Sequence, residues 1–150
     1  MKIIVAVITV LLFISCNSND ESTNDDNPNA NIVTDLPKDT WKITYFFYDN
    51  SDQTNSFSSF SFNFDTNGTV IASNDILSTA GTWSYEDASN DSIDDDGIEN
   101  DEELILVFSE SNLFNDLTDN WHITMATQNK VELFDESSDG TMQFLTFTKE

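Results

Sequence analysis

The sequence predicts an all-β domain, an eight-stranded antiparallel up-and-down barrel, that follows an N-terminal leader and a disordered tether. Three observations support this fold class. Apolar residues recur with a period of two between residues 36 and 150, which is the spacing of half-buried strands. No segment carries a convincing helical period over about ten residues. Short antiparallel strands without covering helices leave exposed edges, and closure into a barrel removes those edges.

The chain begins with a short apolar segment that ends next to its single cysteine. Lys2 precedes residues 3–14, which are apolar apart from Thr9, and Cys16 follows. This run is shorter than the roughly 20 residues that span a bilayer, but it has the composition of a secretory leader. Residues 1–15 resemble a bacterial lipoprotein signal peptide. The resemblance implies that Cys16 carries the lipid and that acyl chains hold the protein on a membrane.

Residues 16–35 are predicted to form a disordered tether. Residues 17–31 are Asn, Ser, Thr, Asp and Glu with one Pro and one Ala, a composition that cannot bury enough apolar surface to offset the entropy lost on ordering. Asn19-Asp20-Glu21 resembles the export signal of surface lipoproteins in Bacteroidetes-type bacteria. The expected location is therefore the cell envelope, on the outer membrane, facing either the periplasm or the cell exterior.

The first four strands are predicted at residues 41–47, 60–64, 69–72 and 81–85. Alternation along the first strand places four side chains on one face: Trp41, Ile43, Tyr45 and Phe47. Asn67-Gly68, between the second and third strands, is the strongest short hairpin signal. In the fourth strand, Trp83 and Tyr85 share a face.

The last four strands are predicted at residues 103–108, 121–125, 131–133 and 142–148. The first of these is nearly continuously apolar, as expected for a central strand. In the next, Trp121, Ile123 and Met125 share the inner face, so His122 should point outward. The spacing of Leu113, Phe114 and Leu117 predicts one helical turn that caps an end of the barrel. In the last strand, either face qualifies for burial.

Four short motifs resemble the lipocalin-like domains of Bacteroidetes lipoproteins: residues 36–41, 64–69, 81–83 and 121–124. The resemblance spans nearly all of residues 36–150. It implies a lipocalin-like barrel that binds a small apolar ligand. The lipocalin signature has Gly-x-Trp on the first strand, whereas this chain has Gly81-Thr82-Trp83 on the fourth predicted strand.

The predicted inner face is rich in aromatic residues, which allows two interpretations. The candidate lining residues of a ligand cavity are Trp41, Ile43, Tyr45, Phe60, Phe62, Trp83, Tyr85, Trp121 and Ile123. They either surround an apolar molecule, with Tyr and Trp polar atoms orienting it, or fill a small barrel. Twelve phenylalanines favour a filled core. An open cavity would favour a ligand carrier, and a filled barrel would favour a surface interaction module.

The connection between the fourth and fifth strands is strongly acidic. Residues 86–103 contain ten Asp and Glu in eighteen positions. Residues 92–103 can be aligned with a twelve-residue calcium loop, which has its turn glycine at Gly97. The proposed ligands are Ser92, Asp94, Asp96, Ile98 through its carbonyl, Asn100 and Glu103. Ser92 stands where such loops have Asp, and a solvated acidic loop explains the run equally well.

The remaining composition narrows the function. There are 28 acidic residues, five lysines and no arginine, for a net charge of −23. Nucleic-acid binding depends on clustered basic residues, so nucleic acid is not an expected partner. His122 is the single histidine, and no nucleophile or carboxylate pair stands out beside it. We do not expect an enzyme.

These features predict a lipid-anchored envelope protein, monomeric, that acts by binding. The first hypothesis is a carrier or sensor of a small apolar ligand inside the barrel. The second is a calcium-responsive surface module that binds protein or glycan through its loops. Calcium is the one cofactor that the sequence suggests.

Lipid attachment at Cys16 is directly testable. Cells that express the full chain should incorporate a clickable palmitate analogue into the wild type and not into a Cys16→Ser variant, because only the thiol accepts the lipid. In-gel fluorescence measures the label. Equal labelling of the two proteins would contradict the anchor.

Overall fold

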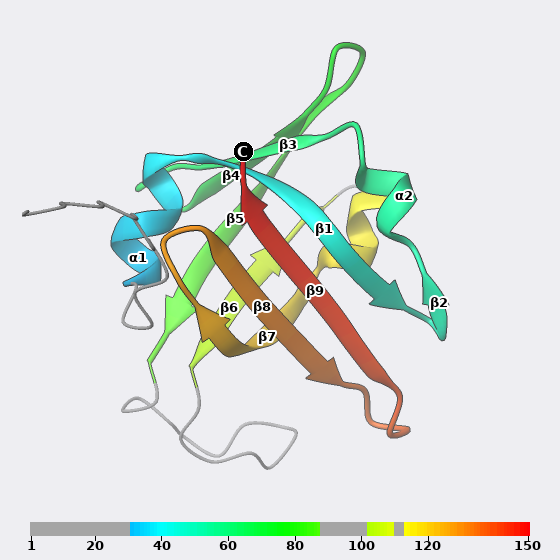
Figure 1. Cartoon of the computed structure of the whole chain (residues 1–150). Helices are drawn as coiled ribbons and strands as arrows, with labels where there is room; N and C mark the ends of the chain where they lie inside the picture. Colours follow the sequence, from blue (N-terminus) through cyan, green and yellow to red (C-terminus); the bar gives the residue numbers. More distant parts are fainter. Residues whose placement is uncertain (1–30, 88–101, 110–112) are drawn as a thin grey trace, which may run out of the picture.

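The computed structural model describes residues 31–87, 102–109 and 113–150, which form an all-β barrel with few helices (Figure 1). The strands are β1 (Thr40–Tyr48), β2 (Ser51–Asp52), β3 (Ser61–Phe64), β4 (Thr69–Ser73), β5 (Ser78–Glu86), β6 (Glu103–Val107), β7 (Asp119–Ala126), β8 (Lys130–Glu136) and β9 (Met142–Lys149). The helical segments are α1 (Ile32–Asp35), η1 (Leu36–Lys38), α2 (Thr54–Phe57) and η2 (Leu113–Leu117).

Eight strands close the barrel in sequential order. Each strand from β3 to β9 pairs antiparallel with the next, β1 pairs with β3, and β9 returns to pair with β1. The two-residue strand β2 pairs antiparallel with Phe47 and Tyr48, the last two residues of β1. The predicted eight-stranded up-and-down barrel is therefore confirmed.

Helical segments cover both ends of the barrel, as α1 and α2 on opposite sides of Figure 1 show. The α1 end carries α1, η1 and the β3–β4 and β7–β8 turns, and the α2 end carries α2 and η2. The helical turn predicted around Phe114 is present as η2. In contrast, the sequence analysis missed α2, which contributes the fully buried Phe57 to the core.

The folded unit begins earlier than predicted. Asn31 caps α1 by accepting a hydrogen bond from the Thr34 N–H at 3.3 Å, as N-cap asparagines do. Ile32 is buried and belongs to the hydrophobic core. The predicted boundary between tether and barrel at residue 36 therefore lies too late, because α1 packs as part of the domain.

Three tryptophans attach connecting segments to the barrel wall through their indole N–H groups. The acceptors are backbone carbonyls: Trp41 donates to Leu36 at 3.0 Å, Trp83 to Asp65 at 2.9 Å and Trp121 to Leu117 at 3.0 Å. These carbonyls lie in η1, at the β3–β4 turn and in η2. Each bond satisfies a polar group that burial would otherwise leave unpaired.

Aromatic side chains fill the interior. Trp41, Phe46, Phe62, Trp121 and Phe147 are each 0% exposed, which places them at the centre of one continuous hydrophobic cluster. Phe114 of η2 contacts four other rings at the α2 end: Phe57, Phe60, Phe62 and Phe108, with centroids 5.0–6.4 Å away. Edge-to-face pairs of this kind add to the stability that burial provides. The structure therefore has a filled interior, as the phenylalanine content favoured.

Two β-bulges change which residues of β1 and β7 face inward, compared with the prediction. The pairing of β1 with β9 shifts between Ile43 and Tyr45, so the residue after the bulge changes face. Phe46 points inward instead, and Tyr45 is 42% exposed. The prediction that Tyr45 lines the interior is therefore wrong. A second shift between Ile123 and Met125, in β7, leaves Met125 44% exposed.

His122 lies on the outer face of the barrel, since it follows the inward-facing Trp121. It is nevertheless only 2% exposed, contrary to the expectation of a surface histidine. Its ring lies 4.9 Å from that of Phe134, its cross-strand partner. Its Nδ1 atom is 3.5 Å from Oε1 of Glu103, its partner on β6.

Gly81 is a site where the barrel tolerates no side chain. A Cβ atom there would lie 2.6 Å from the carbonyl oxygen of Val107 and 2.8 Å from a ring carbon of Phe108. We expect Gly81→Ala to lower the free energy of unfolding by about 1–3 kcal/mol through overpacking. The neighbouring exposed Thr82→Ala is the control and should change it by less than about 0.5 kcal/mol. Urea denaturation measures both, and equal values would contradict the close contact.

Candidate functional site

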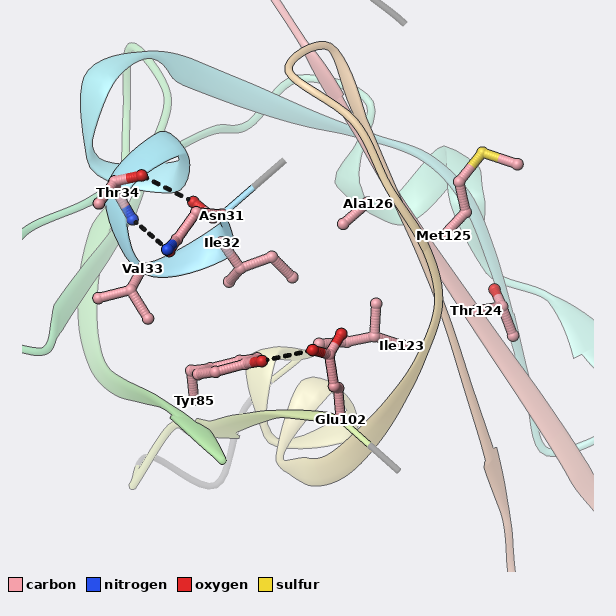
Figure 2. A pocket seen from close by; sticks show the side chains of 10 residues that line it. All are labelled: Asn31, Ile32, Val33, Thr34, Tyr85, Glu102, Ile123, Thr124, Met125 and Ala126. Atoms are coloured by element: carbon pink, nitrogen blue, oxygen red, sulfur yellow. Dashed lines mark hydrogen bonds between the residues drawn. The ribbon is translucent and has the colours of Figure 1, made fainter. Parts of the chain in front are cut away.

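A pocket of about 820 Å³ opens at the α1 end of the barrel, between α1 and β7 (Figure 2). Its lining comes from α1 and its cap, β5, the residue before β6, and β7: Asn31, Ile32, Val33, Thr34, Tyr85, Glu102, Ile123, Thr124, Met125 and Ala126. The pocket therefore lies at the mouth of the barrel, outside the filled interior.

One wall of the pocket is apolar. Ile32, Ile123 and Ala126 point into the space between α1 and β7 in Figure 2. Thr124 and Met125 lie on the far side of the β7 ribbon. The bulge in β7 produces this arrangement, because it restores the inward direction at Ala126, which pairs with the buried Val131. An apolar group in the pocket would thus contact α1 and β7 together.

The polar side of the pocket is a hydrogen-bonded pair. The Tyr85 hydroxyl donates to Oε1 of Glu102 at 2.7 Å. Burial of the ring, the hydrogen bond to Glu102 and the negative charge of Glu102 raise the pKa of Tyr85 to about 12. The Glu102 backbone carbonyl accepts a hydrogen bond from the Ile123 N–H at 2.8 Å. This bond holds the Glu102 backbone beside Ile123 of the apolar wall.

Hydrogen bonds within α1 engage the two Asn31 carbonyl oxygens and the Thr34 hydroxyl and N–H. Oδ1 of Asn31 accepts from the Thr34 N–H, and the Thr34 hydroxyl donates to the Asn31 carbonyl at 3.1 Å. On the far side of β7, the Thr124 hydroxyl donates to the Glu132 carbonyl at 3.0 Å. An ionised carboxylate has about four lone-pair sites, and Tyr85 occupies one of those on Glu102. The Glu102 carboxylate is therefore the pocket's main remaining hydrogen-bond acceptor.

The structure separates the predicted cavity residues into three groups. Tyr85 and Ile123 line the mouth pocket. Six others pack in the filled core: Trp41, Ile43, Phe60, Phe62, Trp83 and Trp121. Tyr45 lies on the outer surface. The aromatic alternation thus predicted the core, and only two of its members reach the pocket.

The α1 side of the pocket and Glu102 were not predicted from the sequence. Ile32 and Val33 fell within the predicted tether, although Asn31 before two branched apolar residues is a helix-start signal. Glu102 was one acid among the ten of residues 86–103, and nothing in that run distinguishes it. Its position became visible only through its contact with Tyr85.

Most of the predicted calcium ligands lie outside the described residues, as does Cys16. These ligands are Ser92, Asp94, Asp96, Ile98 and Asn100. Glu103 is described: it is buried at the start of β6, beside His122. Within residues 31–87, 102–109 and 113–150, no three His, Cys, Asp or Glu side chains are grouped as metal ligands would be. The calcium loop stays a prediction.

No helix of the described ranges has the length and apolar character that crossing a bilayer requires.

Comparisons with known proteins give one structural similarity. No family model matches the sequence, and no curated protein matches it. The fold is similar to the crystal structure of a DUF4847 family protein from Bacteroides vulgatus, with a TM-score of 0.46 and 15% sequence identity. The match covers 77% of this chain and 94% of that chain. At this level of similarity no functional argument follows.

The Tyr85–Glu102 pair predicts a distinctive alkaline titration. The folded-state pKa of Tyr85, about 12, lies above the ordinary value of 10.0. Its contribution to stability is therefore present below pH 10 and is lost as the pH rises toward 12. We expect Glu102→Gln to lower this pKa, because the charge that opposes tyrosinate formation is removed. Tyrosinate absorbance measures the titration, and Tyr85→Phe identifies which transition belongs to Tyr85. An unchanged transition in Glu102→Gln would contradict the coupling.

Proposed function

We propose that this protein is a lipid-anchored, lipocalin-like binding protein of the bacterial cell envelope that holds a small, mainly apolar ligand in its mouth pocket. The observation that carries the proposal is the pocket itself. About 820 Å³ is within the usual range of small-molecule sites. Such sites combine an apolar wall with a few polar groups that orient the ligand, and the Tyr85–Glu102 pair supplies those groups.

The filled core moves the expected binding position from the interior to the mouth. A ligand inside the barrel would have to displace rings such as Trp41 and Phe62, both 0% exposed. Displacing tightly packed core side chains costs several kcal/mol. The mouth pocket requires no such displacement, because its walls already stand apart.

The anchor supports a ligand that partitions into membranes. Asn31 lines the pocket, and residues 17–30 separate it from the predicted lipid-bearing Cys16. As a random coil, the predicted tether would reach on the order of 20 Å. The pocket would then lie near the membrane surface, where apolar molecules are concentrated. Within the proposal, exchange with that membrane makes the protein a carrier or sensor.

A second candidate function is the surface interaction module that binds protein or glycan. The observation that favours it is a row of outward-facing residues in register across four strands: Phe47 on β1, Phe144 on β9, Phe134 on β8 and His122 on β7. Ring centroids are 6.5 Å apart for Phe47–Phe144 and 4.9 Å for Phe134–His122. Phe144 is 37% exposed, so part of this aromatic row is accessible to a partner.

Decanol, a neutral amphiphile, tests the pocket below its aggregation concentration. We expect it to shift the NMR amide signals of Ile32, Ile123 and Ala126 and to raise Tm. Val33→Gln should weaken binding about fivefold, because it removes roughly 1 kcal/mol of apolar contact, while glutamine is compatible with a helix.

Val107→Gln is the matched control for Val33→Gln. Val107 is 41% exposed on β6 and does not line the pocket, whereas Val33 is 46% exposed and does. The decanol affinity of the Val107→Gln variant should equal that of the wild type. Absence of binding to the wild type would rule out the mouth pocket and leave the outer aromatic row as the better candidate. Equal weakening in both variants would contradict the assigned position.

A further inference from the structure

Among the described residues, the lining of the mouth pocket includes a carboxylate and no basic group. None of its ten lining residues is Lys, Arg or His, and Glu102 contributes a carboxylate that faces the space in Figure 2. The four lysines of the described residues lie elsewhere, each in an ion pair: Lys38–Asp35 at 2.6 Å, Lys42–Glu150 at 2.8 Å, Lys130–Glu132 at 2.6 Å and Lys149–Asp39 at 3.0 Å. No described cation is therefore placed to neutralise an anionic ligand.

The hydrogen-bond directions also discriminate between ligands. The Tyr85 O–H already donates to Glu102, so it is not available to an anionic head group. Together the two side chains present acceptors: the remaining carboxylate lone pairs and the phenol oxygen. A ligand carboxylate would face the like charge of Glu102. A protonated amine would instead form a charge-assisted hydrogen bond with Glu102.

The net charge of the whole chain also favours a cationic ligand over an anionic one. A net charge of −23 produces a negative potential that raises the local concentration of cations and lowers that of anions. Glu102 is exposed at the pocket mouth, so salt screens its contribution. The selectivity should therefore be moderate and should decrease with ionic strength.

We propose that the pocket selects cationic amphiphiles, with the apolar chain against Ile32, Ile123 and Ala126 and a protonated amine donating to the Glu102 carboxylate. This inference rests on the proposed function, because it specifies the ligand class of the same pocket. It disfavours fatty acids, whose carboxylate would lie beside the like charge of Glu102.

Three probes with the same chain and different heads test this inference on the full-length protein: decylamine, decanol and decanoate, each below its aggregation concentration. At neutral pH we expect decylamine to bind about tenfold more tightly than decanol, a difference of about 1.4 kcal/mol. Decanoate should bind more weakly than decanol. Titration calorimetry measures the affinities, and raising the salt concentration should reduce the difference between decylamine and decanol.

Two variants separate the local carboxylate from the overall charge. Glu102→Gln keeps an oxygen acceptor for Tyr85 but removes the charge, so decylamine and decanol should then bind within about twofold of each other. Glu86→Gln removes the same charge at the same end of the barrel, from an exposed residue that does not line the pocket. It should preserve nearly all of the tenfold preference.

The outcomes distinguish this inference from the proposed function. If decanol binds and decylamine binds no better, the cationic selectivity is overturned and the binding function stands. If the preference survives Glu102→Gln, or is lost equally in Glu86→Gln, the assigned role of Glu102 is overturned. If none of the three probes binds, the proposed function itself fails.

Discussion

The fold depends on the indole hydrogen bonds that hold the connecting segments against the barrel wall. Trp41 holds η1 at one end and Trp121 holds η2 at the other. A buried hydrogen bond contributes about 1 kcal/mol net, but leaving its donor unpaired costs more. These segments also carry apolar side chains, such as Leu36 and Phe114, into the core. The same contacts therefore both close the barrel ends and fill its interior.

A filled interior determines where binding can take place. In a barrel of this size, side chains alone can occupy the lumen, and aromatic rings do so in this protein. The space that remains is at the mouth, where α1 crosses the barrel end without covering it completely. The pocket therefore combines surfaces from α1 and β7, which lie far apart in the sequence. Its polar pair, Tyr85 and Glu102, stands where the chain enters and leaves the acidic connection between β5 and β6.

Much of the fold could be predicted because its main determinant is local. Alternating or nearly continuous apolar runs located every barrel strand, and the spacing around Phe114 located η2. Bulges could not be predicted, because the extra residue is defined by the pairing with a partner strand and leaves no signature in its own strand. Tyr45 was therefore assigned to the wrong face. The burial of His122 was likewise missed, because it depends on neighbours from β6 and β8.

For the site, the sequence by itself determined the chemistry that is available: an acidic chain, an aromatic core, and a leader with one cysteine beside it. Only the tertiary structure decided which residues form a pocket. Ile32 and Ile123 are far apart in the chain and line one pocket because α1 and the last residues of β7 lie at the same end of the barrel. Nothing in the sequence distinguishes Glu102 from the other acids of its run, whereas the structure shows its contact with Tyr85. Composition and periodicity are properties of neighbouring residues, whereas a cavity is defined by residues that folding brings together from separate segments.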